Sequence, residues 1–172
     1  DVSNEMDKLN ELENSVLKTV ENAEAELQLA NARERVKQSS SDDTPTVLRS
    51  LYNSLKNAVE RAEGAGIEVA EDIQTLRDLE EKIECADELN EVQKIADAVI
   101  KSIDSESIEE VFGTLQAAIE RADTTGLQTE KYQVLSNEMK TTLERLAKEK
   151  ADAQEALSAA RLQDQVLSED SD

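Results

Sequence analysis

Apolar side chains recur at intervals of three and four residues along almost the whole chain, which is the spacing of one face of an α-helix. In the first segment this face consists of Met6, Leu9, Leu12, Val16, Val20, Ala23, Leu27 and Ala30. Good helix formers such as Ala, Leu, Glu, Gln and Lys fill long stretches of the chain. The pattern predicts an all-α protein whose first helix covers residues 3–38.

A short second helix follows a polar linker, residues 39–43. Thr44 and Pro45 predict its start, because a hydroxyl caps the first turn and Pro suits the first helical position. The helix is expected to end near residue 63. Gly66 and Ile67 follow it and predict a Schellman ending, in which the glycine takes a left-handed backbone conformation.

Three further helices continue the alternation of long and short. The spacing predicts a long third helix over residues 69–102, about 50 Å in length at 1.5 Å per residue. Ser107, with Glu110 three residues later, predicts a capping box for a short fourth helix that ends at Gly126. The fifth helix is long, and the acidic tail 168–172 has no apolar anchor and is expected to fray.

Self-comparison reveals an internal repeat of about sixty residues, which is the most specific pattern in the chain. Residues 51–67 align without a gap on residues 111–127. The identical positions are Leu55/Leu115, Ala58/Ala118, Glu60/Glu120, Arg61/Arg121, Ala62/Ala122 and Gly66/Gly126. Six further positions are conservative, and Tyr52/Phe112 is one of them.

The repeat divides the chain into units of a short helix, a Gly stop and a long helix. Residues 44–104 and 105–167 form complete units, residues 1–43 form a partial first unit with the polar linker, and residues 168–172 form the tail. A short helix covers only half of a long one. Each long helix should therefore pack its N-terminal half on the short helix before it and its C-terminal half on the short helix after it. This predicts an elongated array with neighbour contacts, and the alternative is a compact antiparallel bundle, both with coiled-coil-like helix packing.

Composition excludes several classes of chemistry. The chain has 40 acidic and 19 basic residues, a net charge of −21, no His and one Cys. Transition-metal sites and His-based catalysis therefore lack their usual groups, and the four glycines form no phosphate-binding loop. We expect no catalytic, cofactor-binding or metal-binding residues and no enzyme activity. The negative field also excludes nucleic acid as a partner.

The chain has no apolar run near 18 residues, so no membrane-spanning segment is expected. It begins at Asp1 rather than Met, which suggests a processed product or an excised fragment. A lone Cys and the lack of N-x-Ser/Thr sequons are compatible with a cytoplasmic or cytoskeletal location without demanding it.

The repeated pairs Glu60-Arg61 and Glu120-Arg121 are candidates for a binding role. The simpler interpretation is a solvated side of each short helix, where Arg stems cover apolar neighbours. Acid clusters could bind calcium, but no D-x-D-x-D-G loop is present, so only weak, diffuse binding of divalent cations is expected. These clusters are Asp42-Asp43, Glu80-Glu81, Glu109-Glu110 and Glu169-Asp170.

Three other side chains are candidates for chemistry or recognition. Cys85 lies beside the apolar seam of the third helix, and we expect a buried, inert thiol rather than a nucleophile. Tyr52 and Phe112 occupy the same repeat position, and we expect them to pack between helices. The alternative is that they anchor a partner, since aromatic residues are favoured at interface hot spots.

The sequence favours a non-catalytic interaction or scaffolding module, a helical-repeat segment of a larger protein or assembly in which exposed apolar residues bind partner helices. One alternative is an acidic matrix or storage protein that responds to cations, in which case millimolar calcium should raise light scattering. A DNA-mimicking inhibitor is the third hypothesis and rests on charge alone. The pattern is similar in a general way to helical-repeat segments of cytoskeletal or scaffolding proteins, but the sixty-residue period and the absence of Trp separate it from spectrin-like bundles.

Overall fold

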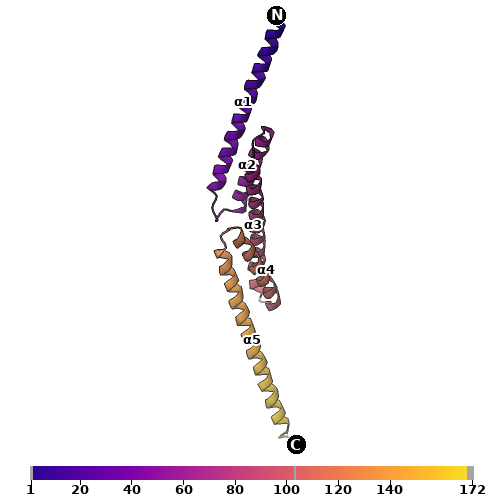
Figure 1. Cartoon of the computed structure of the whole chain (residues 1–172). Helices are drawn as coiled ribbons and strands as arrows, with labels where there is room; N and C mark the ends of the chain where they lie inside the picture. Colours follow the sequence, from indigo (N-terminus) through magenta and orange to yellow (C-terminus); the bar gives the residue numbers. More distant parts are fainter. Residues whose placement is uncertain (1, 103, 170–172) are drawn as a thin grey trace. The chain divides into compact units, whose positions relative to one another are not determined.

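The computed structural model describes residues 2–102 and 104–169, with side chains up to residue 163. Over these residues the chain forms five helices and no strand (Figure 1). The helices are α1 (Val2–Lys37), α2 (Pro45–Gly64), α3 (Ala70–Ser102), α4 (Ser105–Thr124) and α5 (Glu130–Glu169). The predicted all-α fold and its alternation of long and short helices are confirmed. The structure includes Ser168 and Glu169 of the predicted acidic tail in α5, and residues 170–172 lie outside the described part.

The chain separates into two compact units, and the division falls within α3. Compact unit 1 contains α1, α2, α3 up to Asp87 and the loop Thr124–Gln128. Within it, the backbone N–H of Gln128 donates a hydrogen bond to the carbonyl oxygen of Ser41, at 3.0 Å. Compact unit 2 contains α3 from Glu88, α4 up to Asp123 and α5 from its start.

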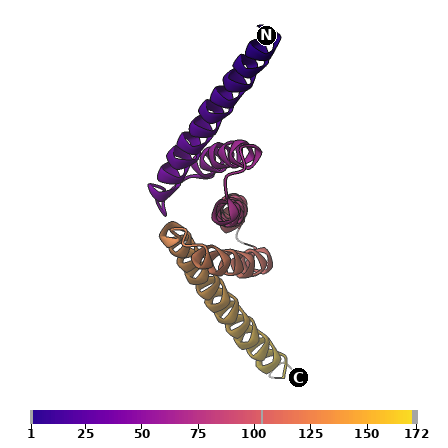
Figure 2. The same cartoon turned by 45° about the horizontal axis from the view of Figure 1, so that its top comes forward.

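The core of compact unit 1 forms where α2 folds back along the C-terminal part of α1 (Figure 2). Small and branched aliphatic side chains fill it, as the composition requires. Its buried residues include Ala25, Leu29 and Ala32 of α1, Leu48, Leu51, Leu55, Ala58, Val59 and Ala62 of α2, and Leu79 of α3. No residue described in α1 before residue 22 is buried even partly. The short helix therefore covers only the C-terminal part of the long one, as its length predicts.

Compact unit 2 has the same kind of core. It joins the C-terminal part of α3 to α4 and to the first ten residues of α5. Its buried residues include Leu89, Val92 and Ala96 of α3, Ile108, Leu115, Ala118, Ile119 and Ala122 of α4, and Tyr132, Leu135 and Met139 of α5. Residues 147–163 of α5 are all exposed.

Buried positions recur at the sixty-residue offset of the sequence repeat. Each of the following buried residues of α1 and α2 has a buried residue sixty positions later in α3 or α4: Ala25/Cys85, Leu29/Leu89, Ala32/Val92, Leu48/Ile108, Leu55/Leu115, Ala58/Ala118, Val59/Ile119 and Ala62/Ala122. The correspondence extends beyond the aligned segment 51–67 into the long helices, where the sequences differ. The repeat itself stays a prediction.

Two helix ends have the predicted chemistry. The Thr44 hydroxyl oxygen accepts a hydrogen bond from the backbone N–H of Val47, at 3.4 Å, and caps α2. At the other end Gly66 has a φ of 78°, and the Ile67 N–H donates to the carbonyl oxygen of Ala62, at 2.9 Å. That bond and the positive φ define the Schellman ending.

The predicted start of α4 is wrong. The helix begins at Ser105, and Asp104 caps it by accepting a hydrogen bond from the Glu106 N–H at 3.4 Å. Ser107 lies inside the first turn and donates its hydroxyl hydrogen to the Asp104 carboxylate. Asp is as good a cap as Ser, and it precedes Ser107, so the helix starts earlier. These hydrogen bonds, above all the one from Ser107, lower the pKa of Asp104.

Substitution of Gly66 tests the helix ending. Ala at this position must adopt a positive φ, so Gly66→Ala should lower the free energy of unfolding by about 1–2 kcal/mol. Gly64→Ala is the matched control. Gly64 ends α2 with open space around its Cα, so Ala there should stabilise the protein by about 0.5–1 kcal/mol. Urea denaturation measures both, and an equal effect of the two substitutions would contradict the assignment.

The Asp104 cap should make the stability of α4 depend on pH. A lowered pKa in the folded state means that the carboxylate contributes stability above its ordinary value of 3.8 and loses that contribution as the pH falls through the folded value. Asp104→Ala should therefore destabilise the protein at pH 7 and have a smaller effect at pH 3. Asp104→Asn keeps a capping oxygen without the charge and serves as the control in thermal denaturation at both pH values.

Candidate functional site

A stripe of exposed apolar side chains runs along α1 and is the main candidate for an interaction surface. We define the α1 stripe as Val2, Met6, Leu9, Leu12, Val16, Val20 and Leu27. Their exposed fractions lie between 50% and 76%. Single exposed apolar residues are ordinary, whereas a continuous row on one helix is typical of a binding surface.

The α1 stripe lies on the face of α1 opposite to α2. The residues of α1 that pack on α2 are Ala25, Leu29 and Ala32. At 3.6 residues per turn, the centre of the stripe lies about 180° around the helix from this packed face. Towards the N-terminus the packed face continues into polar residues such as Lys18 and Glu11, so α2 and the stripe use different sides of α1.

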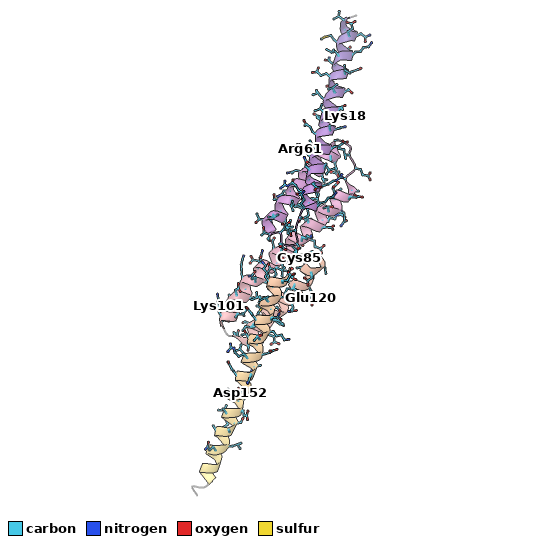
Figure 3. The ribbon with its side chains drawn as sticks, turned by 90° about the vertical axis from the view of Figure 1, so that its left-hand side faces the viewer. Lys18, Arg61, Cys85, Lys101, Glu120 and Asp152 are labelled. Carbon is cyan, nitrogen blue, oxygen red and sulfur yellow. The ribbon has the colours of Figure 1, made fainter. Side chains whose placement is uncertain are left out.

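Figure 3 shows how far the cover of α1 extends. Arg61, near the end of α2, and Lys18 of α1 line one groove between the two helices. N-terminal to Lys18, no helix of compact unit 1 lies beside α1 (Figure 3). Every described side chain in this part of α1 is exposed.

A second groove between α1 and α2 is polar and has a volume of about 730 Å³. Its lining residues are Gln28, Asn31, Ala32, Arg35, Ser54, Asn57, Ala58, Glu60 and Arg61. Arg61 donates a hydrogen bond across it to the Gln28 side-chain oxygen, at 2.8 Å, and Arg35 donates one to the Ser54 hydroxyl, at 3.3 Å. The groove is built for hydrogen bonds, but both arginines already cross-link its walls.

The repeated Glu-Arg pairs take part in these cross-links. Arg61 and Arg121 are exposed, as the simpler interpretation predicts, and each reaches the long helix that precedes it. Arg121 Nη1 lies 2.6 Å from an oxygen of Glu88, which stands sixty residues after Gln28. Glu60 and Glu120 are exposed. The arginines therefore tie a short helix to its neighbour, a role that the sequence did not reveal.

The N-terminal part of α3 is fixed to compact unit 1 by a bidentate ion pair. Arg33 of α1 donates to both carboxylate oxygens of Asp72, at 2.7 and 2.6 Å. The hydrogen bond to Asp72 raises the pKa of Arg33. Asp72 is only 4% exposed, so loss of this partner would leave a buried carboxylate without its ion pair. A second pair joins Arg49 of α2 to Asp87 of α3, whose side chains are 50% and 43% exposed. Sequence reasoning missed both pairs, because no motif links residues almost forty positions apart.

The other candidate side chains are buried or half-buried. Cys85 is buried, as predicted. Tyr52 and Phe112 are half-buried, with the Lys56 ammonium 5.9 Å from the Tyr52 ring centre. Tyr132 is buried and donates its hydroxyl hydrogen to the Asn90 side-chain oxygen, at 3.0 Å.

The acid clusters do not converge. Asp43 in the α1–α2 loop accepts hydrogen bonds from the Ser39 hydroxyl and the Ser40 N–H, at 2.6 and 3.0 Å. The pair Glu80-Glu81 lies exposed on α3 and Glu109-Glu110 exposed on α4. Glu169 ends α5, and Asp170 lies outside the described residues. Within the described part of the chain, no group of three acidic or thiol side chains is arranged to hold a metal ion.

No protein-family model, curated protein or solved structure matches the chain. None of the described helices has the length and apolar character needed to cross a membrane.

Removal of the Asp72 carboxylate tests the ion pair that holds α3. Asp72→Ala should lower the free energy of unfolding by about 1–2 kcal/mol, the lower part of the range for charged hydrogen bonds, because Arg33 keeps access to water. Asp87→Ala breaks an exposed pair and should cost at most about 1 kcal/mol. Urea denaturation compares the two, and a larger loss for Asp87→Ala would contradict the ranking.

Proposed function

We propose that the chain is a non-catalytic interaction module, a segment of a helical-repeat scaffold whose units are about sixty residues long. It binds helical partners through the α1 stripe and presents them at positions fixed by its helices. The observation that carries this proposal is the exposure of the α1 stripe on the side of α1 away from α2. Helix-in-groove and helix–helix binding use the same three- and four-residue spacing of apolar anchors.

Two further observations support the scaffold part of the proposal. Buried positions, glycine helix endings and the Arg61 and Arg121 cross-links all recur at an offset of sixty. Neighbouring units that share one packing scheme are the basis of helical-repeat arrays, in which each unit contacts mainly its neighbours. An elongated array is the arrangement we favour for this chain.

Replacement of two stripe residues tests the proposed binding surface. Leu9→Gln with Val16→Gln should remove about 2 kcal/mol of apolar burial and weaken partner binding about thirtyfold. Gln is a good helix former, so far-UV circular dichroism should not change. The control is Leu157→Gln with Leu162→Gln, which replaces two equally exposed leucines of α5.

The measurement is photocrosslinking from a reactive amino acid placed at Val16, with the same group placed at Glu11 on another face of α1 as the reference. A partner captured from Val16 should be lost with the Leu9 substitution and retained with the α5 control. A protein captured equally from both positions would contradict binding through the stripe.

A further inference from the structure

Five residues of the α1 stripe, Met6, Leu9, Val16, Val20 and Leu27, lie at seam positions of a coiled-coil pattern that covers four heptads of α1. Met6, Glu13, Val20 and Leu27 stand seven residues apart, and Leu9, Val16, Ala23 and Ala30 follow each of them by three residues. This alternation of three and four is the a/d pattern that winds two helices around each other. All eight side chains are exposed. Seven of the eight seam positions are therefore apolar, Glu13 is the exception, and α2 leaves the seam uncovered.

The charges along this seam are negative except for Arg33, which borders the last heptad and pairs with Asp72 of α3. Glu5, Glu24 and Glu26 occupy the positions that border it, and Glu13 lies within it. The lysines of this segment, Lys8 and Lys18, lie outside both the seam and its borders. Border charges select the partner in coiled coils, and a charged residue at a seam position favours an opposite charge across from it. A second copy would bring acidic borders together, on a chain whose net charge is −21.

The packing of α3 in compact unit 1 is an example, within this chain, of a helix with carboxylates pairing with helices that carry basic side chains. There the incoming long helix supplies carboxylates, Asp72 and Asp87, and the helices that receive it supply Arg33 and Arg49. Asp72 and Asp87 stand sixty residues after Leu12 and Leu27 of the stripe. The residues of α3 that correspond to Leu12 and Leu27 therefore pair with arginines of the neighbouring helices.

We infer that the α1 stripe binds a basic amphipathic helix, with an apolar seam bordered by Lys or Arg and a basic residue opposite Glu13. The inference rests on the proposed function and specifies the chemical class of the partner. The seam supplies the apolar contact, while the acidic borders reject acidic helices and second copies and accept basic ones.

The test uses the full chain and three synthetic four-heptad peptides. The first has Leu and Ile in the seam, one seam Lys to face Glu13, and Lys at the borders. The second has Glu at the border positions. The third has the composition of the first in scrambled order, which removes the seam but keeps the charge. Isothermal titration calorimetry at 50 and 300 mM NaCl should give at least tenfold tighter binding of the first peptide than of either control, with a weaker affinity at higher salt.

Variants of the chain separate the contributions of seam and charge. Leu9→Gln with Val16→Gln should weaken binding of the basic peptide at least tenfold, and Leu157→Gln with Leu162→Gln should leave it unchanged. Glu13→Lys should reduce the preference for the basic peptide over the acidic one. The helical content of each variant is checked by circular dichroism.

Several outcomes would overturn the inference. Equal binding of the basic and scrambled peptides would show general charge attraction only. Tighter binding of the acidic peptide, or a dimer of the chain that the Leu9 and Val16 substitutions abolish, would assign the stripe to another partner. Failure of the basic peptide together with specific capture from Val16 would remove the partner class and leave the proposed function standing, whereas failure of both experiments would remove both.

Discussion

A helix of 20 residues can bury only part of a helix of 36, and this mismatch of length governs what α1 exposes. The cover that α2 provides ends near Lys18, so the N-terminal part of α1 relies on its own hydrogen bonds and has no core of its own. Packing usually supplies most of the stability of a helix. The uncovered part is therefore the natural place for a binding surface, because burial by a partner adds the packing that the fold leaves out.

The polar interactions of the described chain serve a different purpose from the apolar cores. Arg33, Arg61 and Arg121 each connect one helix to another, and the Arg33 pair holds a nearly buried carboxylate. Such a pair adds little stability compared with an apolar contact of the same size, but it is costly to break. It therefore fixes the position of α3 on compact unit 1. The small aliphatic cores supply most of the stability, and the arginine contacts determine how neighbouring helices are positioned on each other.

The sequence predicted the fold where the determinants are local. Apolar spacing, Thr44-Pro45 and Gly66 act within a few residues, and the helices they predict are present. The start of α4 was missed because Asp104 competes with Ser107 for the same role, and a cap is chosen by the best available acceptor. The ion pairs of Asp72 and Asp87 were missed for a different reason. They depend on which helices become neighbours, and charge patterns along one helix do not encode that. The α1 stripe was visible as an apolar pattern, but the pattern alone does not show which apolar face remains uncovered.

The acidic borders of the α1 stripe also bear on how the protein behaves before any partner arrives. An exposed apolar surface such as the α1 stripe favours aggregation. Electrostatic repulsion between two copies of the chain opposes contact between their stripes. That repulsion extends about 10 Å at 0.1 M salt and only about 3 Å at 1 M. We therefore expect self-association of this chain to depend on ionic strength, because the carboxylates that we propose for partner selection also repel second copies.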